Sequence, residues 1–366
     1  MKKKILLIVV CALVASCTHI SEKPGVDRVL IFSSNDRSLS GYVDSVSFLP
    51  LETERDYIFR NIDKMVFRNG NIYIGDYHSR KILVYNKDGK GVFTLDRTGR
   101  GPGEYLDMKS FTVDGKYIYI LDNQMRKVHR YEASAGSFVD SFDLSFVAWD
   151  MEVLYNGGFI FAFAPMAGGR LDKSQPPYRI LITDNDMKIT GKMFEYGKGD
   201  YDLIGYPRYF SAYKDEIIYS SYAFDGYVIF DRKTGMAKET VGIVFNHGIP
   251  EKSRQDPAVL SSSYTYLISA PVCCNGYVMT EISNGNYIEN FMYDSSKAAF
   301  VGNAEDDGKS IICSPISCVN GCFVSLVSDI WMYNGLMDAG LDRASLEIEQ
   351  KMEKGCPVLL FYHMKN

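Results

Sequence analysis

A β-rich segment of similar character recurs six times along the 366-residue chain, and this recurrence limits the possible folds more than any other feature. Ile72-Tyr73-Ile74 and Ile118-Tyr119-Ile120 are two of the copies, and the others lie at 158–161, 216–219, 276–279 and 321–324. Their spacing of roughly 40 to 60 residues is the period of one four-stranded propeller blade. The sequence therefore predicts an all-β fold, a six-bladed β-propeller.

The first complete copy shows how one blade follows from the sequence. Apolar and aromatic runs at 64–67, 72–76, 82–85 and 92–95 predict four strands, and Asn69-Gly70 predicts a tight hairpin turn between the first two. The same pattern predicts blades two to five over residues 111–144, 147–196, 208–244 and 266–301. A sixth blade begins near residue 311.

The two ends of the propeller predict how the ring closes. Blade six supplies two clear strands and then a strong final strand, Val358 to Tyr362, while Val43 to Leu51 forms an unassigned strand before blade one. Pairing these terminal strands in the last blade would close the ring and remove exposed sheet edges. Between them, alternating charges and apolar residues over 343–354 predict one short surface helix, which ends at Gly355.

The N-terminus has the pattern of an export signal. Three lysines precede an apolar stretch over residues 5–16, which is shorter than the about 20 residues that span a bilayer. The stretch ends in Val14-Ala15-Ser16-Cys17, which resembles a bacterial lipobox and implies lipid attachment at Cys17. The alternative is an ordinary secretory signal. The predicted organisation is a lipoprotein signal peptide over 1–16, a lipidated cysteine and tether over 17–37, and the propeller over 38–366.

The charge balance excludes nucleic acid as a partner. Removing residues 1–16 with their three lysines leaves 37 Lys and Arg against 45 Asp and Glu. Nucleic-acid binding demands clustered cations, and the cationic patches here are short and interleaved with acids. We expect the protein to contact the membrane through its lipid anchor alone.

Six cysteines follow Cys17, and all of them lie in the last third of the chain. Cys318 and Cys322 flank the turn at Asn320-Gly321 and are candidates for a disulfide across a hairpin. The alternative is that the six are free, buried thiols.

The loop from Arg100 to Tyr105 is the most distinctive local feature, because it alternates glycines around Pro102. One interpretation places Arg100, Glu104 and Tyr105 at the channel mouth as ligand-binding residues. The other is a clasp between two blades. Tyr206 and Arg208 lie on another connection at the same expected face and are further candidates for ligand binding.

Asp76 and Asp122 follow equivalent strands in blades one and two. We expect them to cap the turns through hydrogen bonds to the backbone. Their alternative is Ca²⁺ coordination at the rim, so no cofactor is expected except this ion. Histidine is scarce, and neither a Gly-x-Ser-x-Gly elbow nor a His-Glu-x-x-His helix occurs, so the catalytic residues, if any, are not identified.

With these residues in view, the chain resembles the six-bladed β-propeller lipoproteins of gut-type Gram-negative anaerobes, which are similar to NHL-repeat propellers. The resemblance rests on Gly99-Arg100-Gly101-Pro102-Gly103-Glu104-Tyr105, the lead-in at 46–52 and the segment 356–362. It implies a lipid anchor and a place in the cell envelope, and Thr18 after Cys17 favours the outer membrane. The resemblance supplies no catalytic residues.

Two functions are compatible with these features. The first is an envelope-anchored binding module that holds a glycan, a peptide or an envelope protein on its loop-rich face, and we expect it to be a monomer. The alternative is a metal-assisted lyase or hydrolase that acts at the channel mouth. The missing catalytic motifs favour the first.

Overall fold

The computed structural model describes residues 25–33, 39–169, 173–285, 287–302 and 311–365. The predicted signal peptide and the lipidation site Cys17 lie outside these residues.

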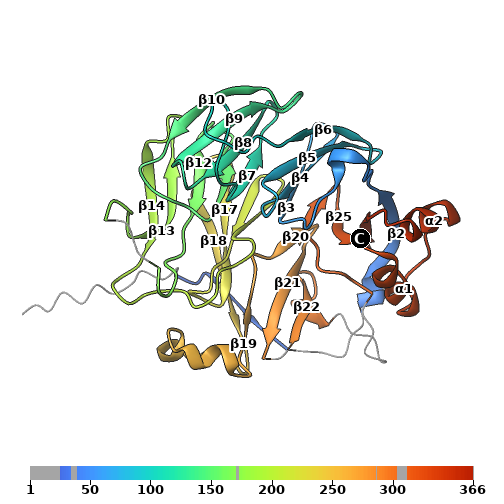
Figure 1. Cartoon of the computed structure of the whole chain (residues 1–366). Coiled ribbons are helices and arrows are strands. Elements are labelled where there is room, and N and C mark those ends of the chain that lie inside the picture. The colour runs from blue at the N-terminus through green and yellow to red at the C-terminus, as the bar shows by residue number, and fades with distance from the viewer. Residues whose placement is uncertain (1–24, 34–38, 170–172, 286, 303–310, 366) are drawn as a thin grey trace, which may run out of the picture.

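The chain forms six sheets around a central axis, as the sequence predicts (Figure 1). The first three blades are β3 (Lys64–Arg68), β4 (Asn71–Asp76), β5 (Lys81–Asn86) and β6 (Gly91–Leu95); β7 (Ser110–Val113), β8 (Tyr117–Asp122), β9 (Lys127–Glu132) and β10 (Phe138–Asp143); and β11 (Asp150–Val153), β12 (Phe159–Ala162), β13 (Tyr178–Thr183) and β14 (Ile189–Glu195).

Blades four to six complete the ring. Their strands are β15 (Phe210–Tyr213), β16 (Glu216–Tyr219), β17 (Gly226–Asp231) and β18 (Ala237–Val244); β19 (Thr265–Leu267), β20 (Val272–Cys274), β21 (Tyr277–Asn284), β22 (Tyr287–Asp294) and β23 (Ala299–Gly302); and β24 (Ser317–Val319), β25 (Cys322–Val327) and β26 (Val358–Met364). Short 3-10 turns lie at Leu39–Tyr42, Arg55–Tyr57, Glu251–Ser253 and Pro257–Ser261.

The N-terminal strand β2 (Val43–Pro50) closes the ring. It pairs antiparallel with the final strand β26, and it is the outermost strand of blade six, in the order β2-β26-β25-β24. The predicted closure by strands from both termini is therefore confirmed. The edge of β26 that would otherwise be open is paired from Val43 to Pro50.

Three blades use Asn-Gly for the turn between their innermost strand and the next strand, namely β3–β4, β20–β21 and β24–β25. Asn69-Gly70, Asn275-Gly276 and Asn320-Gly321 have φ values of 52° and 75°, 47° and 85°, and 49° and 80°. Two consecutive positive φ angles define the type I′ turn, whose twist matches that of antiparallel strands, and Asn-Gly tolerates them best. We call the side of the ring that carries these turns the hairpin face.

The segment before the closing strand is an additional strap that the sequence analysis did not predict. Strand β1 (Arg28–Ile31) lies within residues 17–37, assigned above to a tether, and it pairs in parallel with β18 on the outside of blade four. Phe32 then packs against Phe245, Phe291 and Phe300, with ring centroids 4.8 to 5.2 Å apart. The segment thus bridges blades four and five before the chain reaches blade six.

The hydrophobic core consists of layers between neighbouring blades. One layer joins blades one and two, another joins blades two and three, and a third joins blade six to blade one. Strands inside a blade therefore bury both of their faces, which is why runs such as Ile82–Tyr85 are apolar at consecutive positions, whereas outer strands such as β10 keep exposed residues.

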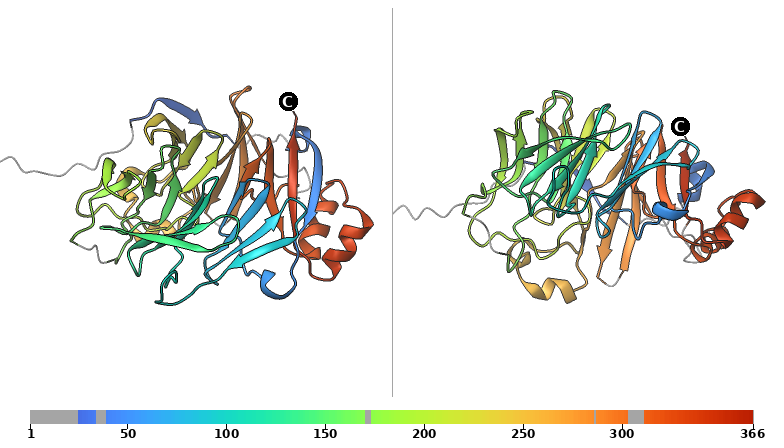
Figure 2. Two further views of the ribbon diagram at one scale, coloured as in Figure 1. Left: turned by 90° about the horizontal axis from the view of Figure 1, so that it is seen from above. Right: turned by 45° about the horizontal axis from the view of Figure 1, so that its top comes forward.

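The connection between β25 and β26 contains two helices, α1 (Ile330–Asp338) and α2 (Leu346–Glu353), and not the single one predicted. The predicted range 343–354 contains α2, while α1 was missed. The Asp329 carboxylate caps α1 by accepting a hydrogen bond from the Met332 amide, and Tyr333 turns inward against Phe48. Both helices lie at the outer edge of the ring beside β2 (Figure 2). No helix in the described part of the chain has the length and apolar character that crossing a membrane requires.

The candidate pairing of Cys318 with Cys322 and the alternative of six free thiols are both wrong, since Cys318 forms a disulfide with Cys274 of blade five. Cys318 lies opposite Phe323 and Cys322 lies opposite Val319 in the hairpin. The two cysteines therefore point to opposite faces of the sheet, because side chains alternate along a strand. The disulfide links β20 and β24, the inner strands of neighbouring blades.

We expect the closing strand to contribute more stability than the strap. A chain that begins at residue 38 loses β1 and Phe32, whereas a chain that begins at residue 52 also leaves the edge of β26 unpaired. Thermal unfolding should show a lower melting temperature for the first chain and no cooperative transition for the second. Phe32→Ala alone should lower the free energy of unfolding by about 2 kcal/mol. Equal melting temperatures for the two shortened chains would contradict this role of β2.

Candidate functional site

The inner strands β3, β7, β11, β15, β20 and β24 surround the central channel, and a cavity of about 490 Å³ lies within it. The cavity reaches turn residues of the hairpin face, among them Lys214, Asn275 and Asn320. It is lined by one acid and five cations, namely Glu152 and Lys64, Arg68, Arg208, Lys214 and Arg232. This cavity is the candidate functional site.

A buried ion network crosses the channel beside the cavity. The Lys64 ammonium lies 3.1 Å from Asp150 Oδ1 and 2.8 Å from Glu152 Oε1, and it donates to the Met151 carbonyl at 2.9 Å. All three charged side chains are at most 7% exposed. Lys64 belongs to blade one and both acids belong to blade three, so these ion pairs join two blades that are not neighbours in the ring.

Blades two and four complete this network. Ser110 and Thr112 of blade two donate hydroxyl hydrogen bonds to Asp150 Oδ1 and Glu152 Oε2, at 2.6 and 2.9 Å. From blade four, Arg232 Nη2 lies 3.5 Å from Glu152 Oε2. The backbone amides of Tyr209 and Phe210 donate to Asp150 Oδ2 at 3.2 and 2.9 Å. These additional hydrogen bonds are what makes burial of the carboxylates tolerable.

The surroundings of Lys64 favour its charged form. Burial by itself lowers the pKa of an ammonium, but the charges of Asp150 and Glu152 outweigh it and hold the pKa of Lys64 above its ordinary value. Burial also lowers the pKa of the Arg208 guanidinium, against the opposing charge of Glu281.

A second cavity of about 400 Å³ extends outward between blades six and one. It shares Phe67, Arg68, Val319 and Asn320 with the channel cavity, so the two lie side by side. We call this second cavity the groove. Its remaining lining is polar or basic at the turns and apolar along the strands, with Asn69, Asn71, Lys87, Leu49, Gly70, Ile72 and Phe361.

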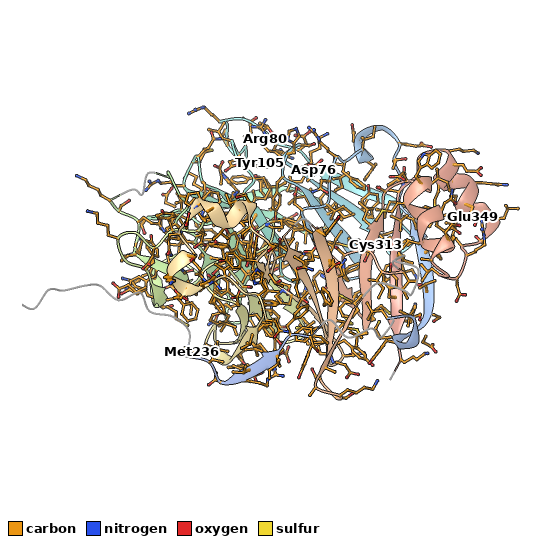
Figure 3. The ribbon with its side chains drawn as sticks, turned by 90° about the horizontal axis from the view of Figure 1, so that it is seen from below. Asp76, Arg80, Tyr105, Met236, Cys313 and Glu349 are labelled. Carbon is orange, nitrogen blue, oxygen red and sulfur yellow. A yellow bond between two sulfur atoms is a disulfide. The ribbon has the colours of Figure 1, made fainter. Side chains whose placement is uncertain are left out.

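The Arg100 to Tyr105 loop does not line either cavity and makes contacts of a clasp between blades one and two. Tyr105 is fully buried, and its hydroxyl donates to the carbonyls of Arg80 and Leu95 at 2.7 and 3.1 Å. Glu104 folds back and accepts from the Gly101 amide at 2.7 Å. Asp76, Arg80 and Tyr105 lie together at this edge of the ring (Figure 3). Of the three candidate residues in the loop, Arg100 alone is exposed.

Tyr206 and Arg208 have different surroundings although they are two residues apart. Tyr206 is 7% exposed, stacks on Tyr209 at 5.7 Å, and donates its hydroxyl to the Leu267 carbonyl. Arg208 lines the channel cavity, where it donates to the Ala270 carbonyl at 3.1 Å. The structure thus brings Arg208 to the cavity and leaves Tyr206 in the packed interior.

Asp76 and Asp122 are buried turn caps. Asp76 accepts hydrogen bonds from the amides of Arg60 and Ser79, and Asp122 accepts from the amides of Leu106 and Met125, all at 2.7 to 3.0 Å. Burial opposes ionisation, but these hydrogen bonds prevail and lower the pKa of both carboxyls. Among the described residues, no group of three His, Cys, Asp or Glu side chains is placed to hold a metal ion.

The residues that form the channel network were not among the predicted site residues. Asp150 and Glu152 alternate within a first strand, so they share one face, and Lys64 begins the first strand of blade one. Charges at alternate positions of a strand expected to be buried were an available signal. Arg68 and Lys214 gave no such signal, because cations at strand ends and turns are common.

Comparison with known proteins places the fold in a family. Residues 21–306 match the DUF5128 family, which is described as a 6-bladed beta-propeller. The chain belongs to the DUF5128 family. No curated protein matches the DUF5128 chain in sequence.

Two solved structures from Bacteroides are similar to this DUF5128 chain. A protein of Bacteroides fragilis that is inferred to be exported shares 19% identity over 92% of this chain and 99% of its own, with a TM-score of 0.72. A member of the DUF4221 family from Bacteroides vulgatus shares 10% identity over 88% of this chain and 97% of its own, with a TM-score of 0.46. The first of these supports the propeller fold.

Replacing Lys64 by methionine in this DUF5128 protein should lower the free energy of unfolding by about 3–5 kcal/mol, because it leaves Asp150 and Glu152 buried without their cation. Chemical denaturation monitored by tryptophan fluorescence would measure the change. Lys238→Met is the matched control, since Lys238 pairs with Glu216 at an exposed site. It should cost about 0.5 kcal/mol or less. Similar losses in both variants would contradict a special role of the channel network.

Tyr105→Phe should lower the free energy of unfolding by about 1–2 kcal/mol, because the buried carbonyls of Arg80 and Leu95 lose a donor. Arg100→Ala should change it by about 0.5 kcal/mol or less, because Arg100 is exposed. Thermal and chemical unfolding of both variants would measure this. A Tyr105→Phe variant as stable as the parent would argue against the clasp.

Proposed function

We propose that this DUF5128 propeller is an envelope-anchored binding protein that holds its ligand in the channel cavity. The observation that carries the proposal is the cavity itself, since about 490 Å³ is within the range of small-ligand sites. The adjoining groove adds about 400 Å³ toward the outside of the ring. The ligand classes compatible with such a site are a glycan, a peptide or a segment of an envelope protein.

The state of the channel carboxylates favours binding over catalysis. Asp150 and Glu152 are the acids nearest to the cavity, and each is held by Lys64 and by a hydroxyl group. A general acid or base needs a free position from which to exchange a proton with substrate. Every oxygen of the two carboxylates already has a hydrogen-bond or ion-pair partner, and this favours a binding role over a lyase or hydrolase reaction at this site.

The proposed location rests on the N-terminal sequence. Residues 1–16 have the pattern of an export signal, and Cys17 ends a lipobox-like motif. The similarity to a Bacteroides fragilis protein inferred to be exported supports the same assignment. We propose lipid attachment at Cys17 and retention at the outer membrane, with the propeller as a monomer.

Ala212→Trp tests the proposal by filling the channel cavity, because Ala212 lines it from β15. A thermal-shift screen of the full-length protein in detergent against oligosaccharides, peptides and divalent cations, with a chelator control, would identify a stabilising probe. That probe should raise the melting temperature of the parent protein and not that of Ala212→Trp.

Ala237→Trp is the matched control, since it makes the same change at an exposed position of β18. It should respond to the probe as the parent does. If Ala212→Trp fails to fold, Ser317→Trp blocks the same cavity from β24. A probe that stabilises the blocked variants as much as the parent would place binding elsewhere and overturn the proposal.

A further inference from the structure

The cations that line the channel cavity divide into two groups. Lys64 and Arg232 are neutralised by the buried acids of blade three, and Arg208 lies 3.8 Å from Glu281. Arg68 and Lys214 belong to the other group. Within the part of the chain that the structure describes, neither forms an ion pair, and Arg68 Nε is buried without a hydrogen-bond partner. Uncompensated positive charge therefore faces the cavity near the hairpin face.

The groove continues this charge outward. Arg68 lines both cavities, and Lys87 stands exposed on the far side of the groove. None of the described residues that line the groove carries a carboxylate. An anionic ligand that extends from the channel into the groove would thus meet Lys214, Arg68 and Lys87 in turn, and each gains a charge-assisted contact.

The uncharged lining is typical of a site for saccharides. Asn275 and Asn320 present side-chain amides at the channel rim, and the Asn275 oxygen is already occupied by the Tyr213 hydroxyl at 2.6 Å. Its nitrogen is left as a donor. In the groove, half-buried Phe67 and Phe361 lie edge to face at 6.2 Å, so they offer apolar ring surface beside the amides. Amide donors with aromatic surface suit the hydroxyl groups and the apolar faces of a sugar ring.

From this charge and lining we infer that the channel cavity and the groove bind an oligosaccharide that carries carboxylate or sulfate groups. The inference rests on the proposed function, since it assigns the ligand class of the same site. Arg68 and Lys214 are its recognition residues, and Lys87 extends the contact. Carboxylate and sulfate share the chemistry that these cations recognise.

Isothermal titration calorimetry of the full-length protein in detergent tests the inference with four probes. These are a tetragalacturonide, a sulfated heparin tetrasaccharide, neutral maltotetraose and a tetraglutamate peptide. At least one acidic saccharide should bind, with an affinity that falls as NaCl is added because the contacts are ionic. The probe that binds, carboxylated or sulfated, identifies the source of the anion. Binding of neither acidic saccharide, equal binding of maltotetraose, or preferential binding of the peptide would overturn the inference.

Two charge-removing variants locate the binding. Arg68→Gln and Lys214→Gln should each weaken binding of the acidic saccharide by about tenfold, the loss expected for one charge-assisted hydrogen bond. Lys214 lies exposed in a turn, so its replacement leaves the packing intact, and melting temperatures would verify both folds. Lys188→Gln is the control, since it removes an exposed lysine from the β13–β14 turn, outside both cavities. It should bind as the parent does.

The outcomes separate this inference from the proposed function. If a neutral saccharide or a peptide binds and Ala212→Trp abolishes that binding, the channel is a ligand site but its ligand is not an anionic saccharide. If an acidic saccharide binds and neither the charge-removing variants nor Ala212→Trp weaken it, the ligand sits elsewhere and both proposals fail.

Discussion

The ion network of Lys64, Asp150 and Glu152 is the interaction on which the centre of this propeller depends. Blades pack on their neighbours through apolar layers, but at the axis the first strands of blades one and three face each other across a channel. One ammonium shared by two carboxylates, with hydroxyl and amide donors from blades two and four, joins those strands. The network also sets the chemistry of the cavity, because Asp150 and Glu152 are paired within it, whereas Arg68 and Lys214 form no ion pair among the described residues.

Stability and the candidate ligand site are divided between the two sides of the ring. On the side of the long connections, Tyr105, Asp76 and Asp122 direct their polar atoms to backbone groups of their own or the next blade. On the hairpin face, tight turns leave Lys214, Asn275 and Asn320 around an opening. The distinctive loop at Arg100 to Tyr105 therefore marks the fold more than it marks a site.

Local patterns predicted the blades, because apolar runs and Asn-Gly turns occupy adjacent residues. The closure was predicted because blade six lacked one strand and an unassigned strand preceded blade one. Contacts between distant residues were less accessible. Lys64 and Asp150 are 86 residues apart, and the Cys274–Cys318 disulfide spans 44. Strand β1 is four residues long and pairs with a strand more than 200 residues away. Its partner could therefore not be predicted from the neighbouring sequence. Of the residues that line the site, Arg208 was predicted from the sequence. Arg68 could be recognised as a site residue only once the structure showed that it lines the cavity.

The position of β1 has a mechanical consequence. Any pull on the chain ahead of residue 25 reaches β1 and its parallel pairing with β18 before it reaches β2. The first contacts to separate would be the four residue pairs between β1 and β18 and the aromatic contacts of Phe32. They lie on the outer side of the ring. If the propeller is held by its N-terminal segment, a pulling force would therefore detach β1 from β18 first. The pairing of β2 with β26, which closes the ring, would remain intact.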